Sequence, residues 1–269
     1  MEKLRFLDLE THTAAENMAI DEAIMKSLEM KEAPATFRLY RWKPSAVSIG
    51  TFQALRTDGN LDFCFLQSVR TEVDLSFCRT HGIDIVRRLT GGSAVYHSTE
   101  GDVTYSIILP KQHRLAPLDI EESYRIICGG IVSGLKHLDI NAVIKHANDV
   151  HVHDKKISGS AQTRRHGCVL QHGSVMLDLD MLMVFSILRM TAGSVSAKTT
   201  QEVQERMTSV CELLGRRVGF NELRDALVAG FSEALGIDLV PGHLTPREKS
   251  GAAQLAASKY ETESWNFLR

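Results

Sequence analysis

One short segment, Arg87–His97, constrains this chain more than any other part of its sequence. It reads Arg-Arg-Leu-Thr-Gly-Gly-Ser-Ala-Val-Tyr-His, so two arginines lead into a Gly-Gly turn and then into a short apolar strand. Arginine binds phosphate or carboxylate groups through a bidentate fork, and paired glycines let a backbone approach a ligand where a Cβ atom would collide. The segment therefore predicts a loop that closes over an anionic small molecule.

A second block supports this interpretation. It covers Lys155–Arg164 and reads Lys-Lys-Ile-Ser-Gly-Ser-Ala-Gln-Thr-Arg, and an Asn-Asp pair, Asn148 and Asp149, precedes it. Together with Arg87–His97, these residues resemble the lipoate–protein ligase family. Its signature is Arg-Arg-x-x-Gly-Gly-Gly-x-Val-x-His-Asp, then Asn-Asp, then Lys-x-Ser-Gly-x-Ala. The resemblance covers nearly the whole chain, from the predicted helix at Asn17–Ala23 to the carboxy-terminal residues.

The secondary-structure pattern predicts an α+β fold with a mostly antiparallel or mixed β-sheet flanked by helices. The resemblance implies the catalytic domain shared with biotin–protein ligases and, more distantly, class II aminoacyl-tRNA synthetases. We expect one such domain over residues 1–269, with a mainly helical part at 179–269. An insertion relative to the family pattern at 54–67 is either a surface loop or a lid over the binding pocket.

Helices are predicted where apolar residues keep helical spacing. One begins at a capping box of Thr13 and Glu16, and another spans 120–135, where glycines indicate close packing against a neighbour. We expect Asn221 to cap a third helix that stops at Gly236, and a fourth to begin at 245–248. Strands are expected at 4–9, 36–41, 46–50, 83–87, 103–109, around 150–152, at 156–161 and at 168–177, with a hairpin turn at 162–167.

Composition excludes several classes of protein. The 269 residues carry a net charge of −2 with no basic stripe, so we expect no nucleic-acid partner. No apolar run approaches membrane-spanning length. The cysteines are single and odd in number, which favours a reducing compartment over a disulfide framework: they are Cys64, Cys78, Cys128, Cys168 and Cys211. These features predict a soluble cytoplasmic protein without a membrane partner.

The resemblance implies that Lys156 is the catalytic residue, with its ammonium contacting the acyl carbonyl and the α-phosphate of ATP. From the residues alone, a solvated lysine beside Lys155 is the favoured interpretation, and the match to the family pattern reverses that preference. Arg87 and Arg88 are adjacent at a strand end and point to opposite faces, so we expect one, Arg88 by the family pattern, to meet the ligand while the other braces the loop. The substrate or lipoyl-AMP-binding residues implied by the resemblance are Arg87, Arg88, Gly91, Gly92, Ser93, Ala94, His97, Ser158, Gly159, Ser160, Ala161 and His172.

Asn148 and Asp149 correspond to the family's pair near the phosphates, and Asp149 could hold Mg²⁺. A turn-forming Asx pair is the competing interpretation. His151 and His153 would share one face of a strand, as zinc ligands can, but no third ligand of firm spacing accompanies them. The sequence also departs from the family at Ser93, in place of the third glycine, and at Ser98, in place of the aspartate after His97. These changes put the pocket shape and the choice of acyl chain in question.

A sister family, the cysteine-dependent octanoyltransferases, also resembles this chain at Gly159–Arg164 and Leu170–Ser174. Those enzymes carry a nucleophilic cysteine upstream of the lysine strand, whereas this chain has none between Cys128 and Cys168. Both of these look like core residues rather than activated thiolates. Without a thiolate no acyl-cysteine can form there, which favours an ATP-dependent lipoate–protein ligase.

As a ligase the chain would use ATP and Mg²⁺ to activate lipoate or octanoate to acyl-AMP. It would then acylate a lysine of an apo lipoyl domain, in a 2-oxoacid dehydrogenase subunit or a glycine-cleavage H-type protein. Because such ligases often carry a further small domain, we expect a separate small accessory protein to supply that part. Two alternatives remain: an octanoyl or lipoyl acyltransferase that draws on acyl carrier protein or another lipoyl domain, and a non-catalytic paralogue that binds acyl-adenylates or a partner.

Overall fold

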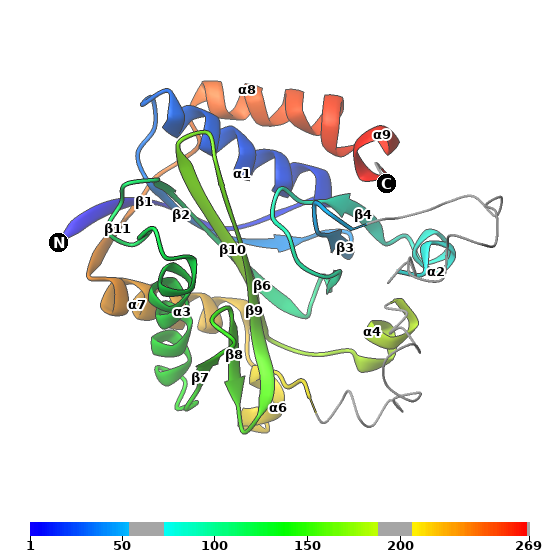
Figure 1. Cartoon of the computed structure of the whole chain (residues 1–269). Coiled ribbons are helices and arrows are strands. Elements are labelled where there is room, and N and C mark those ends of the chain that lie inside the picture. The colour runs from blue at the N-terminus through cyan, green and yellow to red at the C-terminus, as the bar shows by residue number, and fades with distance from the viewer. Residues whose placement is uncertain (54–72, 188–205, 268–269) are drawn as a thin grey trace.

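The computed structural model of the protein describes residues 1–53, 73–187 and 206–267. Within them, a large mixed sheet lies between two layers of helices, and a small second sheet lies beside it (Figure 1). The eight strands of the large sheet follow the order β11 (Ile237–Pro241), β1 (Glu2–His12), β2 (Thr36–Trp42), β6 (Asp102–Pro110), β10 (Cys168–Met176), β9 (Lys155–Arg165), β8 (Asp149–Val152) and β7 (Val143–Lys145).

Most strand pairs of the large sheet are antiparallel, but β1 pairs in parallel with both β2 and β11. The small sheet has the order β4 (Asp84–Arg87), β3 (Ala46–Ile49) and β5 (Val95–His97). The helical segments are α1 (Ala14–Glu29), α2 (Leu75–Thr80), α3 (Ile120–Lys136), α4 (Met181–Ile187), α6 (Val210–Leu214), α7 (Phe220–Leu235), α8 (Pro246–Leu255), η1 (Ala256–Tyr260) and α9 (Glu263–Asn266). The predicted mixed sheet flanked by helices is confirmed.

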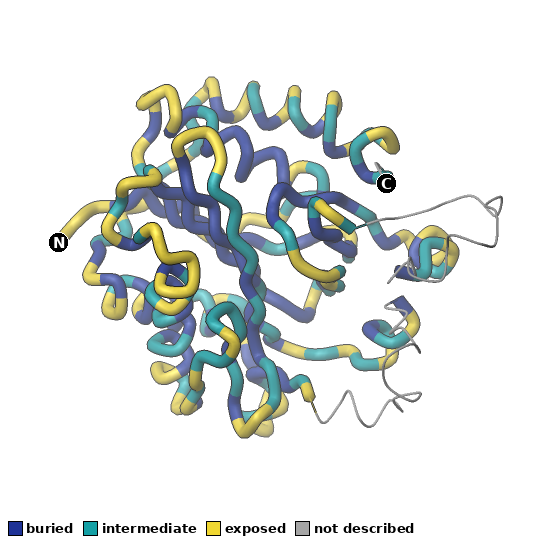
Figure 2. The backbone as a smooth tube through the Cα atoms, viewed as in Figure 1, coloured by how far each residue is buried: buried dark blue, intermediate teal, exposed yellow. Residues whose placement is uncertain are grey.

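Alternation along the strands creates two cores, one on each face of the large sheet. On β6, Tyr105 and Ile107 pack toward α3 and α7, whereas Ile108 packs toward α1 and α8. Ser106, on the α1 face, donates a hydrogen bond of 2.8 Å to Asp21. Figure 2 shows the central strands almost entirely buried. The α1 face of the sheet therefore carries polar groups deep inside the molecule, next to the site described below.

The glycines of α3 let it pack against α7. A Cβ atom at Gly130 would lie 2.4 Å from the ring of Phe231, and one at Gly134 would lie 3.1 Å from Leu227. At Gly129, by contrast, a Cβ atom would meet nothing within 4 Å. The prediction of close packing is confirmed for Gly130 and Gly134 and is wrong for Gly129, which faces open space.

Several helix ends were predicted from capping residues. The capping boxes of α1 and α8 are confirmed, as is the stop of α7 at Gly236 in the left-handed conformation. The prediction that Asn221 caps α7 is wrong, because the helix begins two residues earlier than that cap implies, at Phe220, and Gly219 is the N-cap. The hairpin turn at 162–167 is shorter than predicted, since β9 and β10 continue to a two-residue turn of His166 and Gly167, both with positive φ.

Two short strands, β7 and β11, were not predicted, whereas β5 is the short apolar strand expected after the Gly-Gly turn. The proposed insertion at 54–67 lies outside the described residues. None of the helices in the described part of the chain is long and apolar enough to cross a membrane.

Candidate active site

A cavity of about 480 Å³ draws its wall from both sheets and from α1. This volume lies within the range of about 300–1,000 Å³ that is typical of small-molecule sites. Most of the predicted residues line it: Arg88, Gly92, Ser93, Ala94, His97, Asn148, Asp149, Lys156, Gly159, Ser160, Ala161 and His172. Arg87, Gly91 and Ser158 were predicted with them, but the structure does not place these three in the wall.

Lys156 reaches the cavity from the start of β9. Its Nζ lies 2.8 Å from the Oδ1 atom of Asp149 on the neighbouring strand β8, so the two side chains form an ion pair. Space for the ammonium exists because residue 159 is glycine, where a Cβ atom would lie 2.7 Å from Nζ. Asn148 donates a hydrogen bond of 2.9 Å to the Ser160 carbonyl, which fixes the segment before β8 to β9. Asp149 thus holds the lysine head group against the wall.

The two adjacent arginines do different work. Arg88 donates to the carbonyls of Gly91 and Ser93, at 2.7 and 2.9 Å, and so shapes the loop at one end of the cavity. Arg87 is fully buried and donates to the Gly50 carbonyl at 3.1 Å and the Asn266 carbonyl at 2.9 Å. Arg87 therefore connects the loop after β3 to α9 behind the cavity wall.

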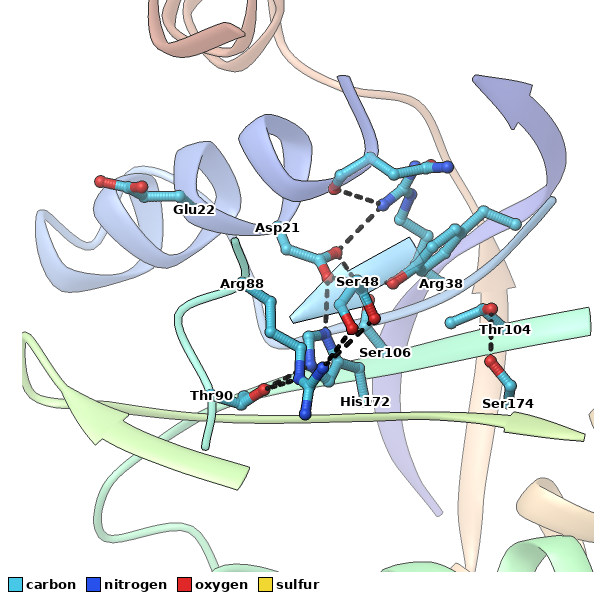
Figure 3. A network of polar contacts seen from close by, with 12 residues as sticks. Asp21, Glu22, Arg38, Ser48, Arg88, Thr90, Thr104, Ser106, His172 and Ser174 are labelled. Carbon is cyan, nitrogen blue, oxygen red and sulfur yellow. Dashed lines mark hydrogen bonds and ion pairs between the residues drawn. The ribbon is translucent and has the colours of Figure 1, made fainter. Parts of the chain in front are cut away.

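His172, on β10, belongs to a buried polar network that joins the large sheet to α1 (Figure 3). Its Nδ1 lies 3.4 Å from Asp21, and its Nε2 lies 2.8 Å from the hydroxyl of Thr90. Asp21 also pairs with the buried Arg38 at 3.0 Å. Burial raises the pKa of Asp21, but the hydrogen bond from His172 and the Arg38 charge outweigh it and hold that pKa below its ordinary value. Burial also lowers the pKa of His172, so the pair is a neutral imidazole donating to a carboxylate.

His97, at the end of β5, forms a second polar relay on the wall. Its Nε2 lies 2.9 Å from the Ser48 hydroxyl of β3, and its Nδ1 lies 3.0 Å from the Asp102 carboxylate of β6. The imidazole stacks on Trp42 with 4.1 Å between ring centroids. Sequence reasoning identified His97 but missed Ser48, Asp102 and Trp42. No local motif marks these residues, because they converge from separate strands.

None of the described cysteines lines the cavity. Cys128, on α3, is fully buried beneath the wall, with its Sγ 3.6 Å from the Ser160 hydroxyl. Burial raises the pKa of the Cys128 and Cys168 thiols to about 11, so both are protonated at neutral pH. Cys64 lies outside the described residues.

The structure also describes the residues considered as metal ligands. Asp149 pairs with Lys156, and within the described segments no group of three or more His, Cys, Asp or Glu side chains could hold a metal ion. His151 lies on β8, whereas His153 follows in a turn with φ of 46°. The two histidines therefore do not share one strand face.

The fold is similar to those of solved lipoate–protein ligases. A bipartite lipoate protein ligase from Thermoplasma acidophilum, reported with its E2 lipoyl domain, has a TM-score of 0.84 and 32% identity, covering 100% of this chain and 98% of that chain. A lipoate-protein ligase A bound with ATP has a TM-score of 0.80 and 30% identity over 99% of each chain. The family model of the lipoyl protein ligase A/B catalytic domain matches residues 13–232. The chain belongs to this family.

Similar curated proteins are octanoyltransferases named LipM. The protein from Symbiobacterium thermophilum is 37% identical over 98% of each chain, and that from Kyrpidia tusciae is 37% identical over the full length of both. The Bacillus subtilis protein is 31% identical over 100% of this chain and 99% of its own. The prediction of an ATP-dependent lipoate–protein ligase is therefore wrong. That prediction depended on the absence of one cysteine, whereas the whole chain is similar to octanoyltransferases. The acyltransferase alternative agrees better with these relatives.

Proposed function

We propose that this protein transfers an octanoyl group, without ATP, to a lysine of a lipoyl-domain protein. The donor is a thioester on acyl carrier protein or on another carrier. The observation that carries the proposal is full-length similarity to octanoyltransferases, combined with a cavity of about 480 Å³ that Lys156 lines. The acceptor class is supported by the related ligase that was solved with an E2 lipoyl domain.

The cavity suits an acyl chain with a reactive carbonyl at one end. Met18, Trp42 and Val184 contribute apolar surface to its wall, which would take the alkyl chain out of water. The Lys156 ammonium, held by Asp149, is positioned to stabilise the negative charge that develops on the carbonyl oxygen during attack. In the overall reaction, the acceptor amine forms a C–N bond, the C–S bond of the thioester breaks, and the carrier thiol leaves with a proton.

Intact-mass analysis of an apo lipoyl domain tests this function. One sample contains the purified protein and octanoyl–acyl carrier protein without ATP, and a second contains free octanoate or lipoate with magnesium-ATP. We expect an octanoyl-sized gain in the first sample. A gain in the second sample alone, or in neither, would refute the proposal. Because only the purified chain is present, transfer would also show that the predicted small accessory protein is not required.

Two neighbouring lysines provide a matched pair of variants. Lys156→Ala removes the ammonium from the cavity wall, and we expect the transfer rate to fall by about 10²-fold or more, the scale of losing one preorganised charge. Lys155→Ala removes a lysine that pairs with Glu212 at 3.1 Å and does not line the cavity. This control variant should transfer at the wild-type rate, and equal rates in both variants would contradict the role of Lys156.

A further inference from the structure

We propose that Ser48 is the nucleophile that accepts the acyl group during transfer, with His97 as its general base and Asp102 as the residue that orients the imidazole. This inference rests on the proposed octanoyl transfer and names an acyl-enzyme intermediate for it. The three residues come from β3, β5 and β6, and all three line the cavity. Their order, hydroxyl to imidazole to carboxylate, is that of a serine hydrolase triad.

The hydrogen bonds fix the direction of proton movement. A carboxylate only accepts, so His97 donates its Nδ1 hydrogen to the Asp102 Oδ2 atom, 3.0 Å away. Its Nε2 is then the acceptor, and the Ser48 hydroxyl, at 2.9 Å, donates to it. This is the tautomer that a base needs in order to take the serine proton. Thr104 donates to the same carboxylate oxygen at 3.1 Å, which helps to hold Asp102 in place.

The pairing of strands explains why these side chains meet. β3 and β5 are antiparallel, with Ala46 opposite His97, so Ser48, two residues from Ala46, points to the same face of the small sheet as the imidazole. Trp42, stacked on the imidazole, blocks its other orientations. The guanidinium of Arg88 donates to the Ser48 hydroxyl at 3.3 Å and to its carbonyl at 2.9 Å. A cation beside the hydroxyl stabilises the oxygen as it loses its proton.

The triad also lies on the same side of the large sheet as the Lys156 ammonium. Ser174 on β10 is directly opposite Gly159 on β9, and directly opposite residues of an antiparallel pair point to the same face, roughly 5 Å apart. The Ser174 hydroxyl lies 3.2 Å from the His97 Nδ1 atom, and the Lys156 amine lies over Gly159. The serine relay and the Lys156 side chain therefore line the same cavity.

Transfer would then take two balanced steps. Ser48 Oγ attacks the thioester carbonyl while His97 takes its proton. The C–S bond breaks, and His97 returns the proton to the leaving thiol, which leaves an octanoyl ester on Ser48. The neutral amine of the acceptor lysine attacks this ester while His97 takes a proton from nitrogen. The C–O bond breaks, Ser48 regains the proton, and the amide product leaves.

The test traps the intermediate on the wild-type protein. Protein and octanoyl–acyl carrier protein are mixed without an acceptor, quenched in acid, and measured by intact mass and by peptide mapping. We expect an octanoyl-sized gain on the peptide that contains Ser48, and its loss when apo lipoyl domain is added before the quench. An adduct on another residue, or no adduct in a protein that transfers octanoyl groups, overturns the proposal. Absence of transfer by the wild type is a separate result, which overturns the proposed function itself.

Variants add a second readout. Ser48→Ala should form no adduct and lose about 10³-fold or more in transfer rate, as expected for removal of a nucleophile. Ser48→Cys should restore an adduct, now as a thioester. Ser45→Ala, whose hydroxyl contacts Thr99 at 3.1 Å outside the cavity wall, should form the adduct as the wild type does. Wild-type transfer rate in Ser48→Ala means that the acceptor amine attacks the thioester directly. If Ser48→Ala does not fold, mapping of the wild-type adduct decides the question alone.

Discussion

Replacing Gly159 by alanine should displace the Lys156 ammonium without removing it. A Cβ atom at this position would lie 2.7 Å from both the Cε and Nζ atoms of Lys156, and 3.4 Å from the Oδ1 atom of Asp149. Ordinary contacts between such atoms are about 3.5–4.0 Å, so the end of the lysine side chain must move by about 1 Å. A displacement of this size at a reacting centre costs about 10²-fold in rate. The loss from Gly159→Ala should therefore approach that from Lys156→Ala.

The assay compares initial rates of octanoyl transfer at saturating donor and acceptor, together with thermal unfolding of each variant. Gly159 lies within strand β9, and the closest atoms to an added Cβ belong to the far end of the flexible Lys156 side chain, so folding should be nearly unaffected. Gly129→Ala, at a site with open space on α3, serves as the glycine control and should keep the wild-type rate. A Gly159→Ala protein that transfers at the wild-type rate would refute the claim that the position of the ammonium matters.

Two further predictions concern stability. Gly130→Ala places a Cβ atom 2.4 Å from the Phe231 ring and should lower the free energy of unfolding by about 1–3 kcal/mol. Gly129→Ala, at a site with open space, should raise it by about 0.5–1 kcal/mol. Urea unfolding measures both, and equal effects would contradict the packing of α3 against α7. Glu248→Gln breaks the charge pairing of a buried 2.6 Å contact with Arg5 and should cost up to about 3–5 kcal/mol at neutral pH. Burial raises the pKa of Glu248, but the Arg5 hydrogen bonds outweigh it and hold that pKa below its ordinary value. The ionised Glu248 therefore stabilises the fold above the pKa of an unfolded glutamate, about 4.3, and this stabilisation is lost as pH falls through the lower pKa of the folded state. The difference in free energy of unfolding between wild type and Glu248→Gln should shrink in acid. A difference that does not change with pH would exclude this linkage.

Local signals in the sequence predicted the helices well. The capping box at Thr13 and the left-handed stop at Gly236 depend on a few neighbouring residues, so they can be found without the rest of the fold. The N-cap of α7 was misplaced because Gly219 caps through its extended backbone and offers no side-chain acceptor. The unpredicted strand β7 is only three residues long, too short to show a period. The parallel pairing of β11 with β1 joins opposite ends of the chain, and nothing local encodes it.

The residues of the candidate site also fall into two groups, those that a sequence pattern marks and those that only the fold brings together. Lys156, Arg88 and His172 lie in segments whose order along the chain could be matched to a family pattern, and the structure places all three in the cavity wall. Ser48 and Asp102 come from strands without any motif, and only the fold brings them to the two nitrogens of one imidazole. A triad is recognised by geometry rather than by sequence position. The sequence therefore indicated most of the cavity wall and missed the hydroxyl that we propose receives the acyl group.

The choice of a ligase over a transferase was wrong in part because Lys156, the residue on which the site was built, does not discriminate between the two reactions. A lysine ammonium beside the carbonyl stabilises the oxyanion whether the leaving group is AMP or a carrier thiol, since the charge develops on the same oxygen in both reactions. What differs is how the acyl group is activated before attack. A thioester arrives already activated, so its transfer needs a base and an oxyanion stabiliser but no phosphate chemistry. We propose that the His97–Asp102 pair supplies the base and that Lys156 supplies the oxyanion stabiliser. The base is the part that a search for a cysteine near the lysine strand could not find.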